Sequence, residues 1–137
     1  MRWLAVLLCA CAALLGGCRR KSAAERVADR FVDLYYVEID QRAALEITAG
    51  RAHDELGEQI AAVGRLRPGE GPRPHTYYEQ VSHRIEGDAA LFVYDLDTKM
   101  GSESGVKRHA TIALARRDGR WKVVSFGEQE GKAPRAR

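Results

Sequence analysis

The chain has 137 residues, 45% of them hydrophobic and 30% charged. This composition suits one globular domain and excludes a chain that is disordered throughout or that crosses a membrane many times. Its 22 basic and 19 acidic side chains give a net charge of +3, which is too even to indicate a nucleic-acid-binding protein. All three cysteines lie within the first 18 residues, so we expect no disulfide, cysteine nucleophile or thiolate metal site in the folded part.

Residues 1–17 have the order of an export signal. One positive charge, Arg2, precedes an uncharged apolar run from Trp3 to Leu15, which is shorter than the roughly 20 residues of a membrane-spanning helix. The run ends in Leu15-Gly16-Gly17-Cys18, which resembles the lipobox of bacterial lipoproteins. The resemblance implies that the Cys18 thiol receives diacylglycerol and that cleavage makes Cys18 the new N-terminus, so that lipid chains hold the mature protein on a bilayer.

Two alternatives remain open for this segment. One is an ordinary secreted protein with a chance cysteine, and the other is cleavage at the box-like sequence Leu8-Cys9-Ala10-Cys11, which would leave a shorter apolar centre. In lipoproteins an aspartate directly after the acylated cysteine commonly retains the product at the inner membrane, whereas this chain has Arg19. The resemblance therefore implies an outer-membrane lipoprotein facing the periplasm, with residues 18–22 as its tether.

Two helices are expected after the tether. Ser22 and Glu25 have the spacing of a capping box, so the first helix begins near residue 23, and an apolar stripe extends it to about Glu38. Asp40 is suited to cap a second helix, whose apolar stripe continues to Val63. Residues 64–76 hold three of the four prolines and predict a loop.

From residue 77 onward the apolar residues repeat every second position, which predicts strands. We expect strands over residues 77–86, 89–99, 106–117 and 120–128, with tight turns at Gly87-Asp88 and Asp118-Gly119. A polar, basic tail, residues 129–137, is expected to be disordered. The predicted fold is α+β over residues 23–128, with two N-terminal helices packed on a curved, four-stranded antiparallel sheet.

The first turn sets a register for the first hairpin. It places His83 opposite Phe92, Val81 opposite Tyr94 and Glu79 opposite Leu96. On this register four polar side chains share the helix-facing side of the sheet: Tyr77, Glu79, His83 and Tyr94.

The second turn sets the register of the second hairpin in the same way. It pairs Leu114 with Val123, Arg116 with Trp121 and Ile112 with Ser125. Phe126 then falls on the other side of the sheet, away from the helices.

The chain has two predicted helices, a loop and a meander that ends in Asp118-Gly119-Arg120-Trp121-Lys122-Val123-Val124. This order resembles the cystatin-like roll of the nuclear transport factor 2-like superfamily. The resemblance covers about residues 22–128 and implies a bent sheet around a helix with a conical pocket. Members include ketosteroid-isomerase-like enzymes, dehydratases and non-catalytic binding or accessory domains, so the fold does not select the function.

The polar residues on the helix-facing side form the candidate site. In an enzyme, Glu79 or His83 would be the general base, and Tyr77 or Tyr94 would donate a hydrogen bond to a developing oxyanion. Four residues along a strand separate the backbones of Glu79 and His83 by about 13 Å, so neither activates the other directly. We therefore expect no catalytic residues.

The sequence predicts neither a metal site nor a cofactor. The four histidines show no H-x-H or H-x-x-x-H pair, and phosphate-loop, dinucleotide-binding and zinc-protease motifs do not occur. Asp95 and Asp97 lie on one strand face about 7 Å apart, and neutralisation by Arg84 or Lys107 is the simpler account of them.

The predicted function is that of an envelope lipoprotein whose small domain binds a protein partner or a small apolar ligand without turning it over. One alternative is a ketosteroid-isomerase-like enzyme. Another is a structural role in a homodimer or larger envelope assembly, through the side of the sheet away from the helices. The lipid bilayer is the expected partner of the acylated Cys18, and nucleic acid is not expected to bind.

Overall fold

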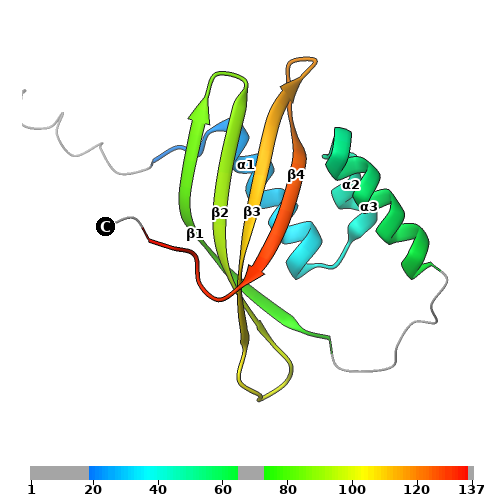
Figure 1. The fold of residues 1–137 in the computed structure, drawn as a ribbon, viewed down its shortest axis with the longest axis vertical. Helices are drawn as coiled ribbons and strands as arrows, with labels where there is room; N and C mark the ends of the chain where they lie inside the picture. The colour runs from blue at the N-terminus through cyan, green and yellow to red at the C-terminus, as the bar shows by residue number, and fades with distance from the viewer. Residues whose placement is uncertain (1–18, 65–72, 136–137) are drawn as a thin grey trace, which may run out of the picture.

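The computed structural model describes residues 19–64 and 73–135, which form a four-stranded sheet with helices on one side (Figure 1). The predicted signal segment, the lipobox and Cys18 lie outside the described residues, as does most of the predicted loop at 64–76. Within the described residues, no helix is both long and apolar enough to cross a membrane.

The first helix, α1 (Ala23–Val32), begins and ends close to the predicted residues. The Ser22 hydroxyl accepts a hydrogen bond from the Glu25 backbone N–H at 3.1 Å, as expected for the N-cap. The helix continues as a π-helical turn, η2 (Asp33–Val37), in which the Glu38 N–H donates to the Asp33 carbonyl at 2.7 Å. The prediction of one helical segment to about Glu38 is confirmed.

The second predicted helix is two helices, α2 (Gln41–Glu46) and α3 (Gly50–Val63). Asp40 caps α2, with its carboxylate accepting from the Ala43 N–H at 3.0 Å. The chain then leaves the helix to bond with the last strand: the Ala49 N–H donates to the Val123 carbonyl at 2.9 Å. Gly50, with φ +55°, starts the next helix. The expectation of one continuous helix is wrong because this backbone pairing replaces a turn of helix.

The strands form an antiparallel meander in the order β1 (His75–Glu86), β2 (Ala89–Lys99), β3 (Val106–Arg117) and β4 (Arg120–Glu130). The two predicted tight turns are present. Asp118 and Gly119 both have positive φ, +50° and +75°, as a type I′ turn requires. The predicted α+β class and antiparallel four-stranded sheet are therefore confirmed.

A bulge in β1 changes which residues face the helices. His83 pairs with Phe92 as predicted, but Val81 is left without a partner, so that Gln80 pairs with Tyr94 and Glu79 with Asp95. Side chains alternate along a strand, and one extra residue moves every residue beyond it to the other side. Tyr77 and Glu79 therefore lie on the side away from the helices, contrary to the prediction.

A second bulge has the same effect in β4. Leu114 pairs with Val123 as predicted, but Ile112 lies opposite Phe126 rather than Ser125. Phe126 thus joins the helix-facing side, where its ring packs 5.1 Å from that of Phe31 on α1.

The chain after residue 128 is more ordered than expected. Strand β4 continues to Glu130, and Ala133 is buried with its N–H donating to Asp95 Oδ1 at 2.7 Å. The expectation of a disordered tail from residue 129 is wrong as far as Ala133. Backbone hydrogen bonds hold this segment against the sheet, including one from the Gly131 N–H to the Lys107 carbonyl.

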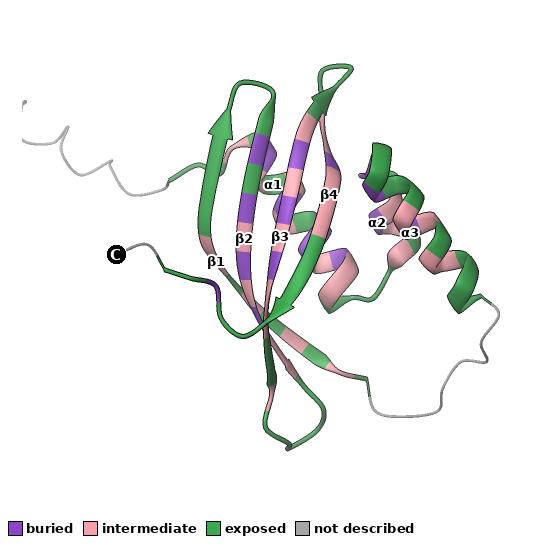
Figure 2. Ribbon diagram, viewed as in Figure 1, coloured by how far each residue is buried: buried purple, intermediate pink, exposed green. Residues whose placement is uncertain are grey.

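The core lies between the helices and the sheet (Figure 2). Helix α1 crosses behind β2, β3 and β4, and α3 lies along β4 (Figure 1). The large side chains that are fully buried come from both layers: Phe31, Val32, Leu56, Phe92, Tyr94, Leu96, Ile112, Leu114 and Val123. These side chains occupy the helix-facing side of the sheet, where the superfamily resemblance implied an open cone.

Candidate functional site

Tyr94, one of the predicted site residues, is part of the core. Its side chain is fully buried, and its hydroxyl donates to Asp29 Oδ1 on α1 at 2.7 Å. Tyr78 makes the equivalent bond to Asp33 Oδ1 at 2.9 Å, and its ring meets that of Tyr94 edge-on at 5.8 Å. These two bonds tie the first helix to the sheet.

Burial and the neighbouring carboxylates raise the pKa of both tyrosines. A negative phenolate is disfavoured next to Asp29 or Asp33, so each hydroxyl stays a proton donor to its carboxylate. Neither Asp29 nor Asp33 was among the residues that the sequence singled out for a site. Their spacing of four residues, which puts both on one helix face, was the available signal.

His83 and Glu79 lie on opposite sides of the sheet. His83 is exposed near the end of the first hairpin, with its ring stacked on Phe92 at 5.9 Å and its Nε2 3.1 Å from Arg19 Nη2. Glu79 lies on the other side because of the bulge at Val81. The predicted alternative, in which these residues and the tyrosines surround one ligand, is therefore wrong.

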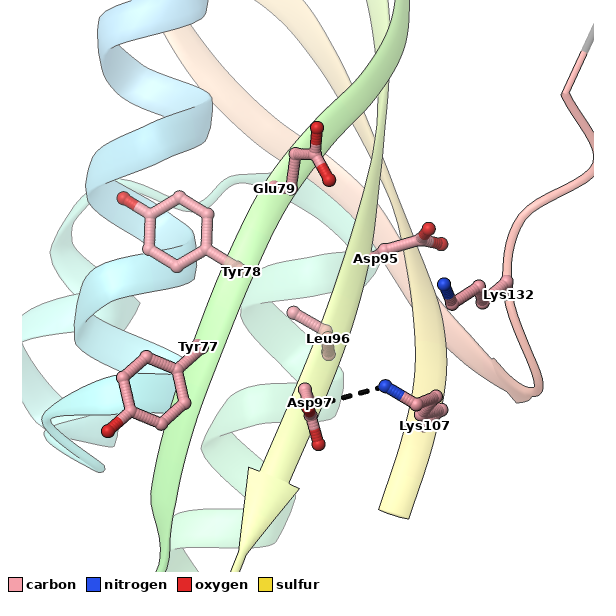
Figure 3. A pocket seen from close by; sticks show the side chains of 8 residues that line it. All are labelled: Tyr77, Tyr78, Glu79, Asp95, Leu96, Asp97, Lys107 and Lys132. Atoms are coloured by element: carbon pink, nitrogen blue, oxygen red, sulfur yellow. Dashed lines mark hydrogen bonds and ion pairs between the residues drawn. The ribbon is translucent and has the colours of Figure 1, made fainter. Parts of the chain in front are cut away.

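Glu79 and Tyr77 instead line a hollow of about 240 Å³ on the side away from the helices (Figure 3). Asp95 and Asp97 of β2 face this hollow, together with Lys107 of β3 and Lys132. Lys107 Nζ lies 3.4 Å from Asp97 Oδ2, which confirms the predicted neutralisation of this carboxylate.

Asp97 also has an unused hydrogen-bond acceptor. Its Oδ1 is buried and has no partner among the described residues, and a β-carbon added at Gly105 would collide with it. The described residues contain no group of three or more histidine, cysteine or acidic side chains placed to hold a metal ion. With charges of both signs, the hollow suits polar or peptide groups better than an apolar molecule.

Beyond the hollow, the same side of the sheet carries a group of uncharged side chains and is not covered by a helix. Figure 1 looks onto this surface, and no helix lies in front of it. Its side chains are small or partly exposed, and they are called the open face below: Leu91, Val93, Thr111, Ala113 and Ser125. Leu91 is 41% exposed, and the other four are half-buried.

Comparisons with known proteins establish the fold. A nuclear transport factor 2 (NTF2)-like protein of unknown function from Pseudomonas putida KT2440 matches with a TM-score of 0.58 and 14% identity, over 75% of this chain and 80% of that one. A structure from Thiobacillus denitrificans, named as a calcium/calmodulin-dependent protein kinase type II association domain, matches with a TM-score of 0.60 and 14% identity, over 77% and 93%.

The described domain thus has an NTF2-like fold. The sequence matches no protein-family model and no curated protein. At 14% identity the structural likeness carries no information about ligand or activity.

Proposed function

We propose that this chain is a bacterial envelope lipoprotein whose domain binds a protein partner, without catalysis, through the open face. The packed core supports binding over catalysis. Phe92, Tyr94 and Leu96 are at most 2% exposed on the helix-facing side, where a ligand of the predicted kind would bind. A small apolar ligand would have to displace these side chains, at a cost comparable to that of disrupting the core.

The open face is the observation that carries the proposal. An antiparallel sheet with one side in water usually carries polar side chains on that side. Here Leu91, Val93 and Ala113 occupy neighbouring strands instead, with the charged hollow at their edge. An apolar centre with a polar rim is typical of a protein-binding surface.

Photo-crosslinking in cells tests this surface. We expect a photoreactive residue at Thr111, in the open face, to form a covalent adduct with a partner protein. The same residue at Glu58, exposed on α3, is the matched control and should form none. Adducts at both positions, or at neither, would contradict the proposal.

A second copy of the chain is the other candidate for the open face. Leu91, Val93 and Ala113 form an apolar patch across β2 and β3, which also suits self-association. The mass of the Thr111 adduct separates the two possibilities, because an adduct of twice the protomer mass indicates a homodimer.

Lipidation is tested by metabolic labelling with an alkyne fatty acid. We expect Cys18→Ser to abolish the label, since the thiol is the proposed acceptor, whereas Cys11→Ser should retain it. The opposite result would assign the lipidation site to Cys11, in the alternative sequence Leu8-Cys9-Ala10-Cys11. Equal labelling of wild type and both variants would refute attachment of the lipid to the thiol of either cysteine.

A further inference from the structure

A groove of about 560 Å³ lies beside the start of α1, and α1 is on the side of the sheet away from the open face. It is formed by α1, the end of α2 and the β3–β4 turn. We call it the basic groove, and its lining residues are Ala23, Arg26, Val27, Arg30, Ile47, Gly119, Arg120, Trp121 and Lys122.

All charged side chains that line the groove are basic. Arg30 is neutralised by Glu38 at 2.9 Å. Arg26 and Lys122 donate to backbone carbonyls, those of Lys21 and Glu46, rather than to carboxylates. Arg120 forms no ion pair within the described residues. Three positive charges thus lack a carboxylate partner in the described part of the chain.

The floor of the groove is apolar and aromatic. Val27, Ile47 and the half-buried Trp121 contribute its apolar lining, and the Arg116 guanidinium lies 5.1 Å from the centre of the Trp121 ring. Tryptophan favours the boundary between lipid headgroups and hydrocarbon, because its ring is apolar and its N–H is polar. Basic side chains around it attract anionic headgroups.

The groove also lies close to the proposed anchor. Ala23, the first residue of α1, is part of its lining and is five residues from Cys18. Five extended residues span at most about 18 Å, so the anchored end of α1 stays near the bilayer. Arg19 and Arg20 add positive charge to this short connection, whereas Lys21 pairs with Asp29 at 2.6 Å.

We propose that the basic groove binds the anionic phospholipid headgroups of the membrane that carries the anchor, and so fixes the orientation of the domain on the bilayer. This inference rests on the proposed acylation of Cys18. Held in this way, the domain turns the open face away from the lipid that the groove contacts, which leaves that face free for a protein partner.

Tryptophan fluorescence tests the inference on the acylated, full-length mature protein. Trp3 leaves with the predicted signal segment, so Trp121 is the single tryptophan and reports the groove directly. The protein is placed in phosphatidylcholine vesicles with brominated acyl chains, with or without phosphatidylglycerol. We expect strong quenching of Trp121 only when phosphatidylglycerol is present, and recovery of the fluorescence at high salt.

Charge variants supply the second arm of the experiment. Arg26→Gln and Arg120→Gln remove exposed charges and should each weaken the phosphatidylglycerol-dependent contact about fivefold, the loss expected for one charge at an anionic surface. Lys99→Gln, at the opposite end of the sheet, is the matched control and should leave the quenching unchanged.

The outcomes separate the two proposals. An intact mass without acyl chains refutes the anchor, whatever the fluorescence shows. An acylated protein whose Trp121 is not quenched, or is quenched equally in both vesicles and in the charge variants, overturns the groove proposal alone. If an acidic protein, and not phosphatidylglycerol, shields Trp121 from quenching, the groove proposal is also overturned.

Discussion

Phe31→Ala is expected to lower the free energy of unfolding by about 3–5 kcal/mol, a large part of the stability of a domain of this size. Phe31 is fully buried on α1, and its ring packs against Phe126 at 5.1 Å and Tyr35 at 5.5 Å. Truncation leaves a cavity between helix and sheet that the surrounding rings cannot fill without leaving their packed positions.

Urea denaturation followed by circular dichroism measures this loss. Val63→Ala is the control, because Val63 is 54% exposed at the end of α3, and we expect it to change stability by less than about 0.5 kcal/mol. A loss below about 1 kcal/mol for Phe31→Ala would show that α1 does not pack on the sheet as described here.

Local signals in the sequence predicted most of the fold. The side chains of Ser22 and Asp40 cap helices where expected, because a cap depends only on the next few residues. Asp118-Gly119 fixes the second hairpin for the same reason, since both residues adopt the positive φ that this turn needs. Strand order followed from these short connections.

Features that depend on tertiary contact were missed. The bulges at Val81 and Val124 carry no distinctive residue, yet each moves part of a strand to the other side of the sheet. The break between α2 and α3 arises from pairing of Ile47 and Ala49 with Val123, about 75 residues away. The periodicity of apolar residues does not indicate which distant residue this segment pairs with.

The predicted site failed for the same reason. One extra residue in β1 places Glu79 and Tyr77 on the opposite side of the sheet from His83 and Tyr94. The four side chains therefore do not line one pocket. The basic groove was equally hidden, since Arg26 on the first helix and Arg120 at the last turn meet only in the folded chain. The lipobox remains a prediction from the sequence, because it lies outside the described residues.

Alkaline pH is expected to destabilise the domain through its buried tyrosines. Burial and Asp29 raise the pKa of Tyr94 above its ordinary value of 10.0, and burial with Asp33 does the same for Tyr78. Above pH 10 the unfolded chain therefore loses phenolic protons that the folded chain keeps. Stability is complete below that pH and falls as pH rises, by up to about 1.4 kcal/mol per pH unit for each tyrosine.

Tyr94→Phe isolates the contribution of one tyrosine. At pH 7 the variant should lose about 1–3 kcal/mol, because Asp29 Oδ1 no longer receives the buried hydroxyl at 2.7 Å. Between pH 10 and 12, however, its stability should fall less steeply than that of the wild type, because the variant lacks one of the two tyrosines whose pKa is raised by folding.

Urea unfolding at a series of pH values gives both quantities. Tyr77→Phe is the matched control, because Tyr77 is 63% exposed and removing its hydroxyl should leave the alkaline slope unchanged. If Tyr94→Phe and the wild type lose stability in parallel above pH 10, the Tyr94 hydroxyl titrates alike in the folded and unfolded chains. That result would contradict the hydrogen bond between Tyr94 and Asp29 that ties the helix to the sheet. It would also weaken the packed core as an argument for partner binding over catalysis.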